Sequence, residues 1–229
     1  MEVACFHDIF KENAICLAEA LGLEIATDIG DKKYIVFGAH LKALELSQLP
    51  QRKQFLILQT ENHAAKAFND KFYLRLLKAN HVLDYSPANR IPLRKLGVNI
   101  FGYFPYLFKP CSSNYRPIDI GFVGSESPER LRIRDKLKAQ YPDKRIEFVM
   151  DWSLMDQQKM TAFLLQCKTV LNIPYYETNA LETHRILKAQ ACGCVVVDQS
   201  LQPIRCKPES TAFLAHVLEM LGWKNNDKP

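Results

Sequence analysis

The sequence predicts a protein of the α/β class, with parallel sheets covered by helices on both faces. Two observations support this class. Short runs rich in β-branched and aromatic residues recur along the chain, and between them apolar residues return every three or four positions, as in an amphipathic helix. Strand runs that alternate with helical segments are typical of parallel strands joined by crossover helices. We expect strands at residues 3–6, 34–37, 55–58, 81–84, 118–123, 146–149, 169–173 and 194–197.

The first four strands belong to the N-terminal half of the chain, where each precedes a segment of helical periodicity. The apolar faces of two such helices consist of Ile9, Phe10, Ala14, Ile15, Ala18 and Leu21, and of Phe68, Phe72, Leu76 and Leu77. The last four strands repeat this alternation in the second half.

The periodic pattern is interrupted once, between residues 105 and 117. This segment contains three prolines and a polar cluster, and neither the helical nor the strand period fits it. We interpret it as a linker between two Rossmann-like domains. The expected organisation is an N-terminal domain at 1–107, a linker at 108–116 and a C-terminal domain at 117–204. A helix at 211–221 and a polar tail are expected within 205–229.

The composition is that of a soluble globular protein, with 48% hydrophobic and 24% charged residues. No apolar run reaches the roughly 18 residues of a membrane span, and the N-terminus lacks the basic segment of a secretory signal. Seven cysteines without a C-x-x-C pair favour a reducing compartment, so we expect a cytoplasmic protein. The His, Cys and carboxylate residues show no metal-ligand spacing, and no metal is expected.

The net charge of +5 favours anionic partners, whether phosphate-bearing small molecules, nucleic acid or a membrane surface. Charge alone does not separate these classes. A nucleic-acid role is not expected, because the basic residues share their helices with apolar faces and no recognition motif is present. No membrane span is expected either, whereas peripheral contact with a membrane stays open.

Polar residues follow most of the predicted strands. Ligands of open parallel sheets bind outside the carboxyl ends of the strands, so the segments that matter are the loops at those ends. In the N-terminal domain they are residues 7–8, 38–40, 59–63 and 84–86; in the C-terminal domain they are 124–127, 172–179 and Asp198.

The stretch at 120–130 is typical of a strand, a tight turn and a helix. Ser127 is a good N-cap, and Pro128 suits the first helical position. Gly124 and Ser125 would let the backbone approach a phosphate at the helix start, where free N–H groups attract anions. Arg130 favours an anion there. The alternative is an ordinary, well-capped turn with no ligand.

The stretch at 170–198 combines residue types that a sugar-nucleotide site needs. A buried strand leads into a polar loop with Asn172, Tyr175 and Tyr176, and then into a helix expected to begin near Thr178 or Asn179 and to end at Gly193. On this helix, a carboxylate and two cations recur at a spacing of three and can share one face: Glu182, Arg185 and Lys188. The alternative is structural: a capping box from Asn179 to Glu182 and a surface ion pair.

Arg185 and the helix end Ala191-Cys192-Gly193 match a family pattern, roughly Arg-x-x-Glu-Ala-x-Ala-Cys-Gly, position by position. The stretch therefore resembles the donor-binding segment of GT-B glycosyltransferases, in particular the CgeB-like and group 1 enzymes of bacteria and viruses. Residues 81–89, 120–125 and 171–177 are similar to other segments of these enzymes, and the likeness covers about residues 55 to 200. One departure is Lys188, where many of these enzymes have a carboxylate, so that Glu182 becomes the best substitute for the ribose contact.

The resemblance implies a GT-B fold, with two Rossmann-like domains that face a cleft. It implies a glycosyltransferase that moves a sugar from a nucleotide-sugar donor in the C-terminal domain to a hydroxyl of a glycan or similar acceptor on the N-terminal side. The nucleotide sugar is a substrate, and no cofactor or metal is expected. The donor-binding residues would be Gly124, Ser125, Arg130, Asn172, Tyr175, Tyr176, Asn179, Glu182, Thr183, Arg185 and Lys188.

An inverting transfer needs a base that removes the acceptor proton, and such a base would come from the N-terminal loops. We expect Glu61, which follows the apolar strand at 55–58, or Asp8, which follows the first strand. The histidines at 7, 40 and 63 are further candidates. Asp8 could instead cap a helix, and a retaining mechanism would need no such base.

Two other classes of function remain open. One is a non-catalytic module that binds a nucleotide sugar or a glycan, which Lys188 favours because it replaces a carboxylate. The other is a sugar-nucleotide epimerase of the same fold. An epimerase would need paired acid and base groups, and the sequence shows no obvious set.

Overall fold

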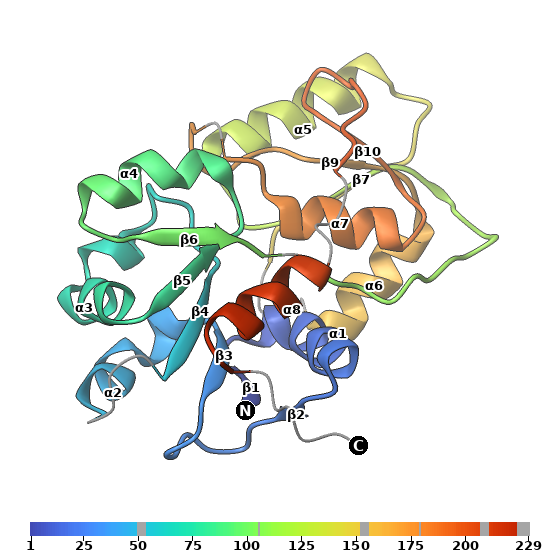
Figure 1. Ribbon diagram of the computed structural model, residues 1–229. Helices are drawn as coiled ribbons and strands as arrows, with labels where there is room; N and C mark the ends of the chain where they lie inside the picture. Colours follow the sequence, from blue (N-terminus) through green and yellow to red (C-terminus); the bar gives the residue numbers. More distant parts are fainter. Residues whose placement is uncertain (50–53, 105, 152–155, 179, 207–210, 224–229) are drawn as a thin grey trace. The chain divides into compact units, whose positions relative to one another are not determined.

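The computed structural model describes residues 1–49, 54–104, 106–151, 156–178, 180–206 and 211–223 (Figure 1). The chain is an α/β protein with two sheets whose strand pairs are all parallel. It forms two compact units. The first comprises Met1–Leu107, Thr178–Ala180 and Pro208–Pro229, and the second comprises Phe108–Glu177 and Leu181–Lys207.

The first unit contains a six-stranded sheet in the order β2-β1-β3-β4-β5-β6. Its strands are β1 (Glu2–Cys5), β2 (Glu24–Ile25), β3 (Tyr34–Phe37), β4 (Phe55–Gln59), β5 (His81–Asp84) and β6 (Ile100–Tyr103). Its helices are α1 (Lys11–Leu21), α2 (Ala43–Gln48), α3 (Lys71–Ala79), α4 (Arg90–Lys95) and α8 (Thr211–Met220). Short 3-10 turns begin several connections, at η1 (Asp8–Phe10), η2 (Ala39–Lys42), η3 (Lys66–Asn69) and η4 (Pro87–Asn89).

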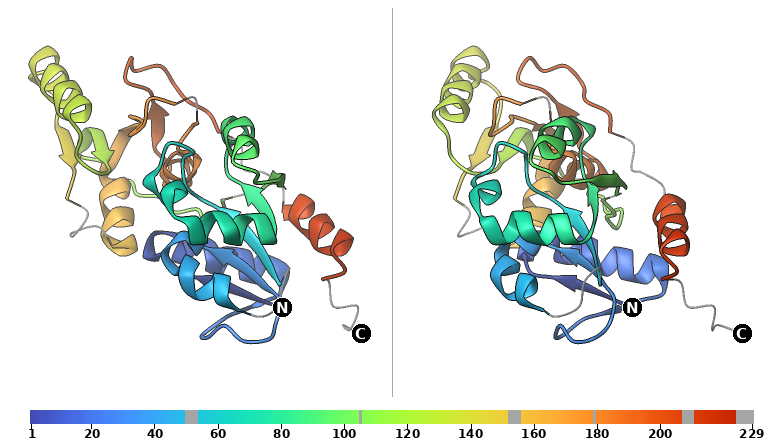
Figure 2. Two further views of the ribbon diagram at one scale, coloured as in Figure 1. Left: turned by 90° about the vertical axis from the view of Figure 1, so that its left-hand side faces the viewer. Right: turned by 60° about the vertical axis from the view of Figure 1, so that its left-hand side comes forward.

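Alternate residues of these strands pack against opposite faces of the sheet, as the pleat requires. Val36, Ile57 and Val82 share one core cluster with Leu76 of α3. On β5 the next residue, Leu83, points the other way and lies close to Phe213 of α8 at Gly102. Helices therefore cover both faces of this sheet (Figures 1 and 2), which is why β4 is buried along its whole length.

The second unit contains a four-stranded sheet in the order β10-β9-β7-β8. Its strands are β7 (Ile118–Val123), β8 (Ile146–Val149), β9 (Cys167–Leu171) and β10 (Val195–Val197), and its helices are α5 (Pro128–Gln140), α6 (Gln157–Gln166) and α7 (Thr183–Ala191). One core cluster joins Val170 to Ile186 of α7, and a second joins Leu171 to Ile133 of α5. Neighbouring residues of β9 thus bury themselves in cores on opposite sides of the sheet.

Each sheet has one point at which the strand order changes direction. β1 lies between β2 and β3, and β7 lies between β8 and β9. At such a topological switch point the loops after the two adjacent strands run to opposite faces and leave a crevice where α/β proteins bind ligands. The first switch point is formed by the loops after β1 and β3, and the second by the loops after β7 and β9.

All eight expected strands are present, several with shifted ends, but two short edge strands, β2 and β6, were missed. The expected start of the helix near Thr178 or Asn179 is wrong. α7 begins at Thr183, its N-cap residue is Glu182, and that residue makes no capping bond with its side chain. The capping box from Asn179 is therefore excluded as well, because Glu182 lies before the first turn. Asn179 itself lies outside the described residues.

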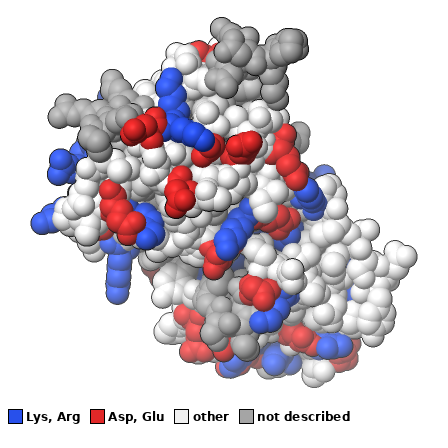
Figure 3. Space-filling view, turned by 90° about the horizontal axis from the view of Figure 1, so that it is seen from below, with Lys and Arg blue, Asp and Glu red and all other residues white. Residues whose placement is uncertain are grey.

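Charged side chains of both signs are interspersed on the face of the molecule shown in Figure 3. No helix in the described part of the chain has the length and apolar character to cross a bilayer.

Candidate functional site

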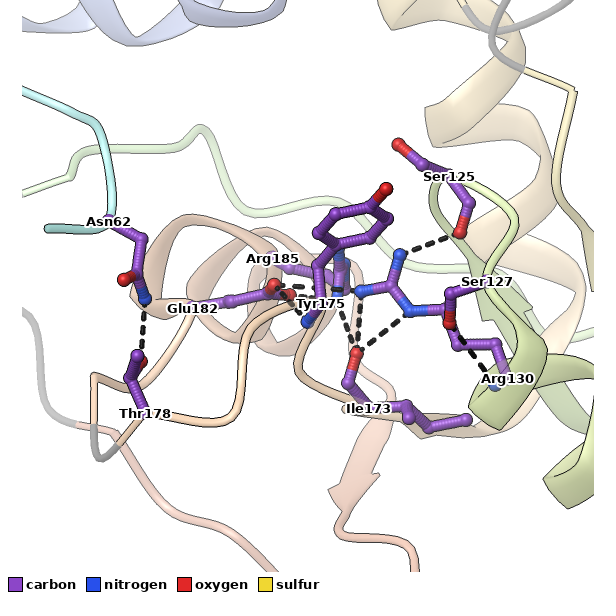
Figure 4. Close-up of polar contacts among 9 residues, drawn as sticks. All are labelled: Asn62, Ser125, Ser127, Arg130, Ile173, Tyr175, Thr178, Glu182 and Arg185. Carbon is purple, nitrogen blue, oxygen red and sulfur yellow. Dashed lines mark hydrogen bonds and ion pairs between the residues drawn. The ribbon is translucent and has the colours of Figure 1, made fainter. Parts of the chain in front are cut away.

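Two arginines from different helices converge on one carbonyl oxygen at the second switch point (Figure 4). Arg130 lies in the first turn of α5, where Ser127 accepts a capping bond from its backbone N–H. Its Nε and Nη2 donate to the carbonyl of Ile173, at 3.1 and 2.6 Å. Arg185 of α7 donates to the same oxygen from Nη1, at 3.4 Å. The loop after β9 is thereby held by both helices.

Gly124, after β7, makes room for this pair. A Cβ atom at that position would lie 3.1 Å from Arg185 Nη2 and 3.2 Å from Arg130 Nη1, closer than most side chains tolerate. Both guanidinium groups also lie over the Phe122 ring, at 5.0 and 5.5 Å from its centroid. The absence of a side chain at Gly124 therefore leaves room for the guanidinium groups of Arg130 and Arg185.

Glu182 is the carboxylate that forms ion pairs with both arginines. It pairs with Arg185, and its Oε1 lies 3.6 Å from Arg130 Nη2. The same oxygen accepts the backbone N–H of Tyr175 at 3.1 Å. Two guanidinium groups against one carboxylate leave one positive charge uncompensated among these three side chains. A buried cation without a partner is costly, so this group of residues favours an added anion.

Burial lowers the pKa of both arginines. The pKa of Arg130 falls to about 10, first because its side chain is buried and then because Arg185 is close. Desolvation also lowers the pKa of Arg185, while Glu182 raises it. At neutral pH, Arg130 remains charged, since its pKa lies well above 7. The positive charge is therefore present under ordinary conditions.

Two buried polar atoms nearby have no hydrogen-bond partner in the described structure. They are Oδ1 of Asn172, directly after β9, and Oγ1 of Thr183, at the start of α7. A buried polar atom usually has a partner, and leaving one without costs free energy. Both atoms belong to residues that the sequence selected as donor-binding, and both could accept or exchange a bond with a bound ligand or water.

The other predicted donor residues have different surroundings. Tyr175 is 48% exposed, and the Arg130 guanidinium lies 5.2 Å from the centroid of its ring. Tyr176 contacts Tyr175 edge-on. Ser125 contributes its carbonyl, which accepts from Arg130 Nη1 at 2.7 Å.

Two predicted donor residues are largely removed from solvent. Arg130 is 1% exposed, and its Nε, Nη1 and Nη2 donate to carbonyls, which positions the loops; its contact with a ligand stays a prediction. Lys188 was expected to share a face with Glu182 and Arg185. It is instead 2% exposed, with Nζ over the ring of Phe108.

The first unit carries a separate polar cluster at its switch point. His7 follows β1, His40 lies on η2 after β3, and Glu61 follows β4. The rings of His7 and His40 are 6.0 Å apart, and His40 Nε2 lies 3.6 Å from Glu61 Oε1. Burial raises the pKa of Glu61, whereas the nearby His7 lowers it to a smaller extent. Burial lowers the pKa of both His7 and His40.

A network of buried amides fixes the backbone of Glu61. Gln59 Nε2 and Asn89 Nδ2 both donate to the Glu61 carbonyl, at 2.7 and 3.1 Å. The same two amide groups donate to the Asp84 carboxylate, at 2.8 and 3.0 Å. Asn89 Oδ1 also accepts the backbone N–H of His63, at 3.1 Å. The loop 61–63 is therefore rigidly attached to the ends of β4 and β5.

Asp84, Gln59 and Asn89 were not among the predicted site residues. The available signal was that each lies within or next to a loop at a strand end, but a polar residue there is as often a turn residue. Burial raises the pKa of Asp84 to about 7, although its hydrogen bonds to Ser86, Asn89 and Gln59 act in the opposite direction.

Asp8, the second candidate base, has different surroundings from Glu61. Its side chain is 87% exposed, and it forms an ion pair with Lys11 at 2.7 Å. That hydrogen bond lowers the pKa of Asp8, so the group is a weaker base than Glu61. The helix turn after β1 is capped by His7, which accepts the N–H of Ile9, and not by Asp8.

Among the described residues, no group of three or more His, Cys, Asp or Glu side chains is placed to hold a metal ion. No protein-family profile and no curated protein matches the chain.

Proposed function

We propose that the protein is a glycosyltransferase of the GT-B type, which transfers a sugar from a nucleotide diphosphate or monophosphate donor to a hydroxyl acceptor. The observation that carries this proposal is a pair of arginines at the second switch point, the buried Arg130 and the half-buried Arg185, which share one carboxylate, Glu182. A phosphate group supplies the missing negative charge. The two parallel sheets, each with one switch point, are the architecture that two Rossmann-like domains require.

In the proposed donor site, different residues bind the phosphate, the ring systems and the hydroxyl groups of a nucleotide sugar. Arg185, whose side chain is 16% exposed, offers its guanidinium to the phosphate, and Arg130 fixes the loops behind it. The exposed side chain of Tyr175 suits a base or a sugar ring. Glu182 is the candidate for hydroxyl groups of the ribose or the sugar.

Glu61 is the proposed catalytic base, and Asp8 is not. In the reaction, the Glu61 carboxylate takes the proton of the acceptor hydroxyl. At the same time the oxygen of that hydroxyl forms a bond to the anomeric carbon of the donor sugar. The bond from that carbon to the phosphate oxygen breaks, and its electron pair leaves with the nucleotide phosphate. Cationic N–H groups stabilise the charge that develops on the leaving group. We propose Arg185 for this role.

The test is a thermal-shift panel with UDP-glucose, GDP-mannose, CMP-sialic acid and dTDP-rhamnose, followed by assay of sugar release from the best binder. We expect at least one nucleotide sugar to raise the Tm and to be hydrolysed slowly. Arg185→Gln should abolish the shift. The matched control is Arg132→Gln, because Arg132 is an exposed arginine of α5 paired with Glu129. Absence of a shift with all four compounds would contradict the proposal.

A second candidate is a non-catalytic nucleotide-sugar-binding module. The observation that favours it is Lys188, which is buried against Phe108 at the position where the resembling enzymes carry a carboxylate. The panel separates the two functions: a binder raises its Tm with a nucleotide sugar and never releases the sugar.

A further inference from the structure

The first switch point brings three proton-binding side chains together from three separate strand ends. β1 and β3 are adjacent in the sheet, so the residues that follow them, His7 and His40, lie side by side. Glu61 comes from the end of β4, the neighbour of β3 on its other side. The parallel topology alone places these residues at one edge, although they are far apart in the sequence.

The backbone around the histidines is built for this proximity. Gly38 has φ 68°, and a Cβ there would lie 2.9 Å from the Cβ of His7. Only glycine combines the left-handed conformation with so close an approach. Glu61 is fixed from the other side by the amides of Gln59 and Asn89. The group is thus rigid, a property of sites rather than of surface loops.

His40 has one ring nitrogen toward Glu61 and one buried without a partner. Nε2 is the atom 3.6 Å from Glu61, whereas Nδ1 has no hydrogen-bond partner among the described residues. The ring packs edge-on against Tyr73. Since burial lowers the pKa of His40, the ring is neutral at pH 7 and carries a single N–H. With that proton on Nε2, His40 directs its N–H dipole at the carboxylate across 3.6 Å, longer than a direct hydrogen bond, and leaves Nδ1 as an unprotonated acceptor.

The ionisable groups that act on Glu61 and on the rings beside it are few. Glu61 interacts with His7 and His40 at the switch point and with Tyr73 and Tyr106 in the core. The exposed Asp8 acts on His7, and the buried Asp84 acts on the two tyrosines. No described lysine or arginine forms an ion pair or hydrogen bond with Glu61. The cluster is therefore without a positive charge at neutral pH, in contrast to the arginine pair of the second unit.

We propose that His40 is a positioning residue for Glu61, and that this cluster receives an uncharged hydroxyl compound as the acceptor. The inference rests on the proposed transfer reaction. His40 holds the carboxylate in its deprotonated form and directs one oxygen toward the acceptor hydroxyl, whose proton passes to Glu61 as the glycosidic bond forms. A phosphorylated or carboxylated acceptor is disfavoured, because Glu61 would repel it and no described cation of the cluster would compensate.

The first experiment compares the pH dependence of sugar release or transfer in three variants, using the nucleotide sugar that raises the Tm most. Glu61→Gln should lower kcat by about 10²- to 10⁴-fold, as expected for loss of a general base, and leave the nucleotide-induced Tm shift unchanged. His40→Leu should move the acid limb of kcat to higher pH, because the Glu61 carboxylate loses the N–H dipole that His40 directs at it from 3.6 Å. His40→Gln retains a donor and should restore the limb. His216→Gln, an exposed histidine of α8, is the matched control.

A purely structural role for His40 predicts a different result, namely lower activity at every pH without movement of the acid limb. That result, or normal kcat in Glu61→Gln, would overturn the inference while nucleotide binding remains intact. Failure of the proposed function is distinguishable, because then no nucleotide sugar raises the Tm of the wild-type protein.

The second experiment does not depend on activity and follows the His7 ring by NMR. Because the Glu61 carboxylate raises the pKa of His7, Glu61→Gln should move the titration of His7 to lower pH. An unchanged titration of His7 would show that Glu61 does not interact with this histidine, and it would contradict the inference that these side chains act as one cluster. An acceptor panel then tests the charge: neutral sugars such as methyl glycosides should increase sugar transfer, and preference for a sugar phosphate over its neutral parent would contradict the proposed acceptor class.

Discussion

Arg130 and Arg185 donate to the same carbonyl oxygen, that of Ile173, and both are paired with the same carboxylate, Glu182. Like charges on neighbouring helices normally repel. Here the carbonyl and the carboxylate hold them together, and the loop after β9 is fixed as a result. The excess positive charge leads us to expect that anions stabilise this loop.

The first prediction concerns Glu182→Gln, which removes the carboxylate and leaves two buried cations facing each other. We expect the free energy of unfolding to fall by roughly 3 kcal/mol or less, below the range for a fully buried pair because Glu182 is partly exposed. Inorganic diphosphate should restore more stability to this variant than to the wild type. Urea unfolding with and without diphosphate measures both effects.

The control for this prediction is Glu129→Gln. Glu129 forms an exposed ion pair with Arg132, and such pairs contribute less than about 1 kcal/mol. An equal loss of stability in both variants, or the same response to diphosphate, would show that Glu182 does not balance a buried charge.

The second prediction concerns Gly124→Ala. The added Cβ would lie 3.1 to 3.2 Å from the two guanidinium groups and 3.0 Å from the Phe122 ring, so these groups must move. Crowding of this kind costs about 1–3 kcal/mol. We therefore expect a lower Tm and a weaker shift with nucleotide sugars. Gly30→Ala is the matched control, because its Cβ would meet only Tyr34 Oη, at 3.8 Å.

The third prediction is a pH dependence that comes from Asp84. Its pKa is about 7 in the folded protein and near 4 when unfolded, so the folded state binds an extra proton between these values. This contribution is fully present below about pH 4 and is lost as the pH rises to 7, amounting to about 4 kcal/mol at most. Asp84→Asn should flatten this part of the curve.

Urea unfolding of the wild type and of Asp84→Asn, from about pH 4.5 to about pH 7.5, checks whether the free energy of unfolding falls as the pH rises. The difference between the two proteins isolates Asp84 from the histidines, whose lowered pKa values act in the opposite direction. The asparagine keeps one acceptor oxygen and replaces the other with an NH2 group, so it loses the hydrogen bond from either Gln59 or Asn89 and its absolute stability should be lower. Parallel curves for the two proteins would refute the assignment.

The strands were predictable where periodicity was clear. The continuous apolar run of β4 indicated a strand buried on both faces, and the strand is buried throughout. The edge strand β2 was not predictable, because its two residues, Glu24 and Ile25, are exposed and carry no alternation. The start of α7 was misplaced because Asn179 and Glu182 have the spacing of a capping box, a local signal that the tertiary contacts of Glu182 with Arg130 and Arg185 override.

The candidate sites were predictable only in part, for a related reason. The sequence selected Glu61 because it follows a strand end, where ligands bind. It selected Arg185 and Glu182 because of their spacing and their resemblance to a family pattern. These patterns could not show that Arg130 is engaged by carbonyls, or that Asp84 and Asn89 are buried beneath Glu61. Those facts depend on which distant segments pack together, and the sequence carries no local signal of that packing.

The last prediction concerns Cys111 and Cys192, whose Sγ atoms are 3.2 Å apart at the end of α7. The backbone N–H of Cys111 donates to Ala191 at 2.8 Å, which holds the two segments together. Oxidised glutathione should first form a mixed disulfide at the half-buried Cys111, and Cys192 should then displace glutathione to give a disulfide with loss of two hydrogens. Burial raises the pKa of Cys192 to about 12, so the second step should be slow at pH 7 and faster at pH 9.

Peptide mass spectrometry identifies the Cys111–Cys192 bond, and urea unfolding measures its effect. Because the bond closes a long loop, it should add up to about 4 kcal/mol to the free energy of unfolding, which reduction then reverses. Cys111→Ser should prevent both the bond and the gain in stability. Cys206→Ser is the matched control, since Cys206 is also half-buried in this unit and should leave the reaction unchanged. A disulfide between Cys111 and Cys206 in place of Cys192 would contradict the predicted pairing.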